Sequence, residues 1–203
     1  MGLENTTKLI YLSIASGKIC RRVQQPTEKS ISRTNKKGTV VHEEYYDLIS
    51  GKLKDIGTRS HEEYGKFWEI CIEDKGALYM LQLKYSSGYA SGFLRAIKNA
   101  NLHERLTLIP HSKEENGKIK TTLFINQNGQ VLKHYYTKVN PNGMPAFRKV
   151  KVKGIEQWDD TDTMEFLERM VDSEIKPLLY GGTSRKSLPE ATYTDLTQEA
   201  LSF

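Results

Sequence analysis

Three carboxylates close together in the chain come nearest to the spacing of a catalytic centre. Asp159, Asp160 and Asp162 could hold a divalent metal ion, and a metal ion held in this way could cleave nucleic acid. The same residues stand at the expected start of a helix, where carboxylates are stabilised by the unpaired N–H groups of the first turn. We therefore favour helix capping, with Asp162 as the N-cap and Glu165 completing a capping box, and keep a metal-dependent nuclease as an alternative.

The other motifs with chemical potential are incomplete. The tetrapeptide HEEY occurs at His42–Tyr45 and His61–Tyr64, but it lacks the second histidine of a helical zinc site. Ser-Gly-Lys occurs at Ser16–Lys18 and Ser50–Lys52 without the flanking residues of a phosphate-binding loop. The two cysteines have the spacing of neither a zinc site nor a disulfide framework, so we expect buried thiols. These observations predict no catalysis, no metal and no cofactor.

Charge is distributed unevenly along the 203 residues. The whole chain has a formal charge of +5, but Ser187–Phe203 contains three acids and no base, which leaves +8 on the residues before it. Within that basic body, Lys113–Lys153 holds nine bases against two acids. Such a concentration indicates a polyanionic partner, although a solvated basic face would have the same composition.

Alternating sequence predicts the hairpins that position these charges. Lys66–Asp74 and Ala77–Tyr85 alternate on either side of a Lys-Gly turn. Pairing them with the shortest connection places Trp68 on the core face and Phe67 beside Lys84 on the opposite face.

A second hairpin is predicted at Asn128-Gly129, the dipeptide that a type I′ turn prefers. It joins Lys118–Asn126 to Gln130–Lys138, with Gln127 opposite Gln130. The expected core face of this hairpin consists of Ile119, Leu123, Ile125, Leu132, His134 and Tyr136. The expected outer face consists of Lys118, Lys120, Phe124, Lys133, Tyr135 and Thr137, with Phe124 directly across from Lys133.

Further elements complete the expected architecture. A long polar loop is predicted at Gln24–Thr39, followed by a hairpin that turns at Ser50-Gly51. A helix is predicted from about Ser91 to Asn101, then a strand, Leu106–Ile109, stopped by Pro110. A second helix precedes Pro177.

Cations that alternate with rings on an outer face meet the needs of a single-strand binder, because ammonium groups contact phosphates and rings stack on bases of any sequence. A mainly antiparallel sheet broken once by a helix also suits an OB barrel, in which a helix connects two of the later strands. We therefore expect single-stranded DNA as the partner. The candidate phosphate contacts are Lys84, Lys118, Lys120, Lys133, Lys138, Arg148, Lys149 and Lys151, and the candidate stacking residues are Phe124, Tyr135, Phe147 and Tyr89.

Thr194–Phe203 (TDLTQEALSF) combines acidic residues with a C-terminal phenylalanine. This segment resembles the tails of single-stranded DNA-binding proteins from bacteria and phages, in which an acidic segment ends in a phenylalanine that replication proteins bind. The resemblance implies that Asp195, Glu199 and Phe203 form a partner-binding tail. The tail departs from the family pattern in having a thinner run of acids and no proline beside the final phenylalanine.

The segment from Gly92 to Leu179, especially TTLFINQNGQVLKHYYT and VKGIEQWDDTDTMEFLERMV, resembles DNA-binding proteins encoded by crAss-like phages of gut Bacteroides. The resemblance implies a role in phage DNA replication or recombination in the cytoplasm of a host cell.

The prediction is therefore a mainly β, antiparallel OB-like β-barrel with one inserted helix and a C-terminal helix. It places an OB-like nucleic-acid-binding domain at residues 1–180 and a disordered acidic tail at 181–203. No run approaches the ~18 apolar residues of a membrane span, and the N-terminus lacks a secretion signal, so we expect an intracellular protein without a membrane partner. Self-association is left open. The alternative to DNA binding from another class is a protein–protein adaptor or virion component with a basic sheet face.

Overall fold

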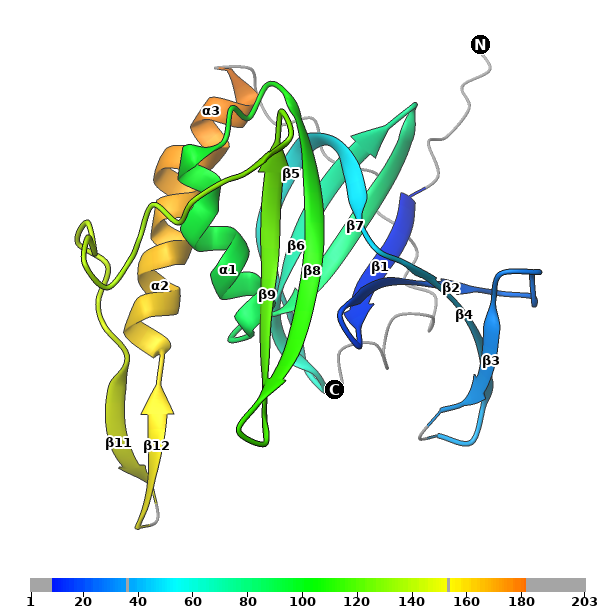
Figure 1. The fold of residues 1–203 in the computed structure, drawn as a ribbon, viewed down its shortest axis with the longest axis horizontal. Coiled ribbons are helices and arrows are strands. Elements are labelled where there is room, and N and C mark those ends of the chain that lie inside the picture. Colours follow the sequence, from blue (N-terminus) through cyan, green and yellow to red (C-terminus); the bar gives the residue numbers. More distant parts are fainter. Residues whose placement is uncertain (1–8, 36, 153, 182–203) are drawn as a thin grey trace.

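A computed structural model describes residues 9–35, 37–152 and 154–181 (Figure 1). Its main feature is a ten-stranded sheet. The strands of this sheet are β1 (Leu9–Ala15), β2 (Lys18–Val23), β3 (Ile31–Thr34), β4 (Val40–Tyr46), β5 (Ile49–His61), β6 (Gly65–Asp74), β7 (Ala77–Lys84), β8 (Arg105–Glu115), β9 (Lys118–Gln127) and β10 (Gln130–Val131). Their order is β10-β9-β8-β5-β6-β7-β1-β2-β4-β3, and β1 is parallel to β7 while the other pairs are antiparallel.

The hairpin of β6 and β7 confirms the predicted register. Phe67 pairs with Lys84, Trp68 with Leu83, and Asp74 with Ala77. Trp68 is buried in the core, as predicted. Phe67 is buried as well, although it lies on the other face of the strand.

Strand β5 replaces the hairpin turn that was predicted at Ser50-Gly51. Its first residues, Ile49–Lys52, pair with β8, and residues 52–61 pair with β6, with a bulge between Leu53 and Asp55. A Cβ atom at Gly51 would overlap the carbonyl oxygen of Glu73. The glycine therefore permits a close approach of two strands rather than a turn.

Strand β8 continues through Pro110 as far as Glu115, so the prediction that the proline stops it is wrong. Pro110 lies opposite Leu123 of β9. On its other side β8 pairs with β5 only through Arg105–Leu108. The missing N–H is tolerated because one edge of β8 is already free at this position.

The Asn128-Gly129 turn forms as predicted, with positive φ angles of 54° and 79°, and Gln127 pairs with Gln130. The second strand, however, ends at Val131. The chain then crosses to the first helix, where the backbone N–H of Tyr135 donates to the carbonyl oxygen of Arg95 at 2.7 Å. A carbonyl near a helix C-terminus lacks a partner within the helix, and this contact supplies one.

Two helical segments cover one face of the sheet (Figure 1). The first is α1 (Gly88–Ala96), extended by a 3₁₀ turn, η1 (Ile97–Asn99). The second comprises α2 (Thr161–Met170), a π-helical turn, η2 (Val171–Ile175), and α3 (Lys176–Tyr180). The core lies between these helices and the sheet.

The start of α2 differs from the predicted capping box. The N-cap position is Asp160, whose side chain makes no capping hydrogen bond. Instead, the carboxylate of Asp159 accepts hydrogen bonds from the backbone N–H of Thr161 at 3.0 Å and from its hydroxyl at 2.6 Å.

Two parts of the chain extend away from this core. Strands β2, β3 and β4 form one end of the sheet, here called the wing. Strands β11 (Arg148–Val152) and β12 (Ile155–Asp159) form a separate two-stranded sheet, here called the arm. Figure 1 shows the arm beyond the start of α2, on the opposite side of the molecule from the wing.

The fold class is therefore mainly β, with a helix between β7 and β8 and a C-terminal helical segment, as predicted. The sheet is open, and the wing places a strand, β3, inside the segment that was expected to be a loop. Among the described residues, no helix is long and apolar enough to span a bilayer. Residues 182–203 of the predicted tail lie outside the described residues.

Candidate nucleic-acid interface

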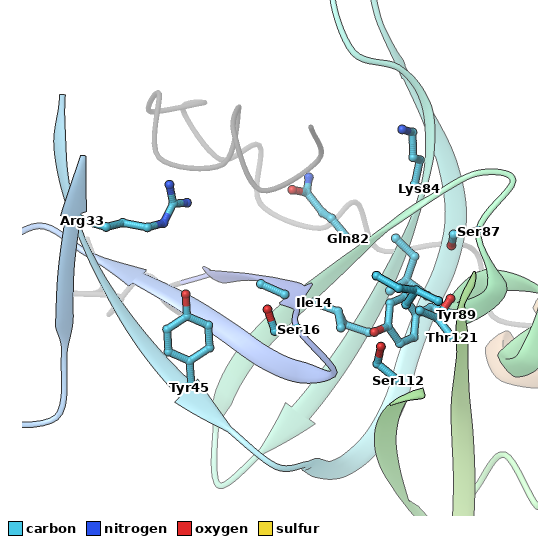
Figure 2. A pocket seen from close by; sticks show the side chains of 13 residues that line it. Ile14, Ser16, Arg33, Tyr45, Gln82, Lys84, Ser87, Tyr89, Ser112 and Thr121 are labelled. Carbon is cyan, nitrogen blue, oxygen red and sulfur yellow. The ribbon is translucent and has the colours of Figure 1, made fainter. Parts of the chain in front are cut away.

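A groove of about 590 Å³ lies where the wing, the end of β7, the start of α1 and the β8–β9 hairpin meet (Figure 2). Its lining mixes polar and apolar side chains. The lining residues are Ile14, Ala15, Ser16, Arg33, Tyr45, Gln82, Leu83, Lys84, Ser87, Tyr89, Ser112, Ile119 and Thr121.

Close backbone contacts form the walls of this groove. The β1–β2 turn has positive φ angles at Ser16 and Gly17, and a Cβ atom on Gly17 would lie 3.0 Å from the Cβ of Ser112. At the start of α1, a Cβ atom on Gly88 would overlap the carbonyl oxygen of Thr121. The turn and the helix are therefore both packed tightly against the β8–β9 hairpin.

The wing contributes Arg33 and Tyr45 to the groove, and one buried carboxylate, that of Glu43, holds both side chains in place. Glu43, only 2% exposed, accepts hydrogen bonds from Arg33 Nε at 2.8 Å and from Tyr45 Oη at 2.7 Å. Arg22 contributes a third contact to the same carboxylate at 3.2 Å. Burial alone would raise the pKa of Glu43, but these hydrogen bonds outweigh burial and lower its pKa. Burial and the bond to Glu43 raise the pKa of Tyr45 to about 12, so its hydroxyl stays protonated at neutral pH.

The other wall of the groove carries Lys84 and Tyr89, two of the predicted DNA contacts. Lys84 is exposed, and it forms no ion pair with any described residue. Tyr89 is half-buried, and burial raises the pKa of its hydroxyl. The groove thus presents cations for phosphates together with neutral phenol rings and hydroxyls for bases and sugars.

A second group of predicted contacts lies on the outer face of the β8–β9 hairpin. Register places Lys120 opposite Lys113, and Phe124 opposite Ile109. The rings of Phe124 and His111 are 5.9 Å apart between centroids. Lys118 belongs to the same alternating set as Lys120 and Phe124. This face points away from the groove, whereas Ile119 and Thr121 point into it.

Three predictions about this hairpin are wrong. Phe124 does not lie across from Lys133, because β10 ends before that residue. Ile119 is 73% exposed rather than buried, since the tip of the hairpin extends beyond the core. His134, expected on the core face, is exposed in the segment that leaves the sheet.

A third group lies around the C-terminal end of α1 and the arm. The ring of Tyr135 has Lys98 Nζ 4.5 Å from its centroid, and the ring of Phe147 has the Arg95 guanidinium carbon at 5.4 Å. The other predicted members of this group are Lys133, Lys138, Arg148, Lys149 and Lys151. The structure therefore divides the predicted site into three surfaces instead of one.

The predicted cations differ in how they are paired. Lys120 pairs with Glu115, Arg148 with Asp159 at 3.4 Å and Asp162 at 3.1 Å, and Lys149 with Glu156 at 3.4 Å. Five others form no ion pair within the described part of the chain: Lys84, Lys118, Lys133, Lys138 and Lys151. These five keep their charge available for a polyanion.

The carboxylates considered for metal binding have other contacts. Asp159 caps α2 and pairs with Arg148, and Asp162 pairs with the same arginine. Across the residues that the structure describes, no group of three or more His, Cys, Asp and Glu side chains is placed to hold a metal ion.

Several residues at these surfaces were not predicted. Arg33 lies in the segment expected to be a loop, and Tyr45 in a strand assigned to another hairpin. Trp158 of the arm is 67% exposed. The local sequence contains no signal for Arg33, because its position depends on a carboxylate, Glu43, in the neighbouring strand. The tail candidates Asp195, Glu199 and Phe203 lie outside the described residues.

Comparisons with protein-family models, with curated proteins and with solved structures found no match for this chain.

Proposed function

We propose that this protein binds single-stranded DNA without sequence preference, in phage replication or recombination, and catalyses no reaction. The observation that carries the proposal is the groove, which combines Lys84 and Arg33 with the rings of Tyr45 and Tyr89. Single-strand binders use this combination because the cations follow the phosphate backbone while the rings stack on any base.

The strand order supports an OB-like unit within the sheet. The segment from β5 to β9 runs three strands, a helix and two strands, and its strands lie in the order β7-β6-β5-β8-β9. The first of these strands, β5, is long and bulged, and it pairs with β6 along one edge and with β8 along the other. We propose that this segment corresponds to the five-stranded Greek-key OB barrel, with β1 added at the edge of β7 and the wing beyond it.

The position of the groove fits that assignment. OB folds bind oligonucleotides across their second and third strands and beside the loop between their fourth and fifth. Here these elements correspond to β6, β7 and the β8–β9 turn. Lys84 lies at the end of β7, and Ser112 and Thr121 lie near the tip of the β8–β9 hairpin.

A titration of a labelled single strand and a matched duplex at several salt concentrations tests the proposal. We expect tighter binding to the single strand and a linear fall of log affinity with log salt. With roughly three to six phosphate contacts at about −0.7 each, the slope is roughly −2 to −4. A flat salt response, or tighter binding to the duplex, would contradict the proposal.

Lys84→Ala localises the contact to the groove. It should weaken single-strand binding and make the salt slope shallower by about 0.7, the contribution of one phosphate. Lys52→Ala is the matched control, because Lys52 is also exposed and forms no ion pair with the described residues, but it lies on β5 outside the groove. If both variants weaken binding equally, the groove is not the site that binds the single strand.

A further inference from the structure

The two tryptophans of the chain have opposite environments. Trp68 is 1% exposed in the core, whereas Trp158 on the arm is 67% exposed. A large ring exposed on a projecting hairpin adds little to folding stability, since burial of apolar area is what stabilises. Its environment suggests a binding role instead.

Trp158 shares one face of the arm with two lysines and with Glu156, which pairs with Lys149 at 3.4 Å. Register pairs it with Lys149, and the adjacent pair on the same face is Lys151 with Glu156. Lys149 Nζ lies 5.5 Å from the centroid of the Trp158 ring. Lys151 forms no ion pair with a described residue. At the base of the arm, Phe147 is a second exposed ring, at 40%, next to the Arg95 guanidinium.

This composition suits a nucleic acid better than a protein partner. The centre of a protein–protein interface is depleted of charged residues. Around Trp158, by contrast, Lys149, Lys151 and Glu156 are charged and exposed. A single strand needs only a ring for a base and nearby cations for phosphates, and the arm offers both.

We propose that the arm is a second binding surface for single-stranded DNA, with Trp158 stacking on a base and Lys149 and Lys151 contacting the adjacent phosphates. The inference rests on the proposed function and adds to it a site on the opposite side of the molecule from the wing (Figure 1). The groove and the arm would then contact different stretches of one strand, or two strands.

Tryptophan fluorescence tests this placement directly. Titration of the full chain with poly(dT) should quench the emission of the exposed tryptophan, and fluorescence anisotropy of a labelled strand should report binding in parallel. Trp158→Ala should abolish the quenching and weaken single-strand binding about 5- to 150-fold, the range measured for loss of one stacked base. Trp158→Phe should keep most of the affinity, because a phenyl ring still stacks.

Ile155→Ala is the control on the same arm, since Ile155 is 72% exposed but belongs to the other face by register. It should leave affinity and quenching unchanged. Thermal unfolding of all three variants should match that of the unmodified chain, because the arm lies outside the core.

The outcomes separate the two proposals. Single-strand binding without a change in tryptophan emission, and with full affinity in Trp158→Ala, would overturn the role of the arm while the groove proposal stands. Loss of self-association in Trp158→Ala, seen by light scattering, with DNA binding unchanged would assign the arm to contacts between copies and also overturn the inference. Absence of any single-strand binding by the unmodified chain would refute both proposals.

Discussion

Gly92 of α1 lies directly against Thr122 of β9. A Cβ atom at position 92 would overlap the hydroxyl oxygen of Thr122 and would come within 3.0 Å of the backbone nitrogen of Leu123. The backbone of α1 therefore packs directly against β9, with no room for a side chain at position 92. This contact fixes the start of α1, and with it Tyr89, relative to the groove wall formed by Thr121.

Replacement of Gly92 by alanine should consequently destabilise the protein. Helix propensity alone favours alanine by about 1 kcal/mol, but overpacking of a tight contact costs about 1–3 kcal/mol. We expect the second effect to dominate and to lower the melting temperature measured by circular dichroism. Ser91→Ala, one position away on the same helix, is the control and should change stability little. A Gly92→Ala variant as stable as the unmodified chain would mean that α1 can move away from β9.

Glu168 joins α2 to three other parts of the fold and should make stability depend on pH. Its carboxylate accepts hydrogen bonds from Thr58 Oγ1 at 2.8 Å, Lys66 Nζ at 2.6 Å and Tyr85 Oη at 2.7 Å. Burial alone would raise the pKa of this carboxyl, but the three hydrogen bonds outweigh burial and lower the pKa below its ordinary value. A lowered pKa stabilises the fold above the ordinary value, and the stabilisation is lost as the pH falls through the lowered pKa.

Glu168→Gln should therefore reduce the free energy of unfolding at neutral pH by about 1–3 kcal/mol. The difference from the unmodified chain should shrink as the pH falls below the ordinary glutamate pKa and through the lowered pKa of the folded chain. Denaturant titrations across this pH range measure the difference in free energy of unfolding between the variant and the unmodified chain. Glu165→Gln on the same helix is the matched control, because Glu165 is exposed and pairs with Arg169 at 3.8 Å. An equal loss in both variants would show that Glu168 acts only through net charge.

Burial predicts opposite effects for two pairs of neighbouring residues, Leu123 and Phe124 on β9 and Tyr135 and Tyr136 in the segment after β10. Leu123 is fully buried and Tyr136 is 1% exposed, so replacing either by alanine should cost about 2–5 kcal/mol of folding free energy. Phe124→Ala and Tyr135→Ala should leave folding much less affected and weaken single-strand binding by about 1–3 kcal/mol each. Thermal unfolding and anisotropy titrations on the same four variants compare the two quantities. If the ring variants bind normally, neither Phe124 on the outer face of β9 nor Tyr135 takes part in DNA binding.

The acidic tail should compete with DNA for the basic body. Ser187–Phe203 carries three acids and no base, and its tether gives it a high local concentration beside that body. Truncation after Lys186 should tighten single-strand binding most at low salt, with the gain fading near physiological ionic strength, where screening acts over about 8 Å. Phe203→Ala should leave DNA affinity unchanged and abolish capture of a replication protein. Unchanged affinity at every salt concentration would exclude masking by the tail.

The elements that sequence predicts well are those whose partners are close along the chain. The β6–β7 register, down to Phe67 opposite Lys84, follows from alternation and a short turn. The Asn128-Gly129 turn follows from the positive φ angles that these residues tolerate. In both cases the interacting residues are so close in sequence that the local pattern alone determines the structure.

The features that the sequence did not predict depend on contacts with residues far away in the chain. Tyr135 leaves the sheet because its N–H binds a carbonyl of α1, and no local pattern encodes that choice. Arg33 belongs to a strand because of its bonds to Glu43, not because of apolar alternation. The arrangement of the candidate site has the same cause: alternation identified individual cations and rings, but it could not predict that the fold distributes them over a groove, a hairpin face and an arm.

The parallel pairing of β1 with β7 has a consequence for how the chain acquires its fold during synthesis. Leu9 pairs with Leu78, and Leu12 with Leu81, so β1 is synthesised well before the strand with which it pairs. Strands β5 to β9 pair mostly with near neighbours and can assemble first, because closing long loops slows folding. We expect pulse-labelling hydrogen exchange to show late protection of β1 amides relative to those of β6. Before β1 pairs with β7, the edge of β7 is open. The wing, which forms part of the groove, is then not yet held against the rest of the sheet.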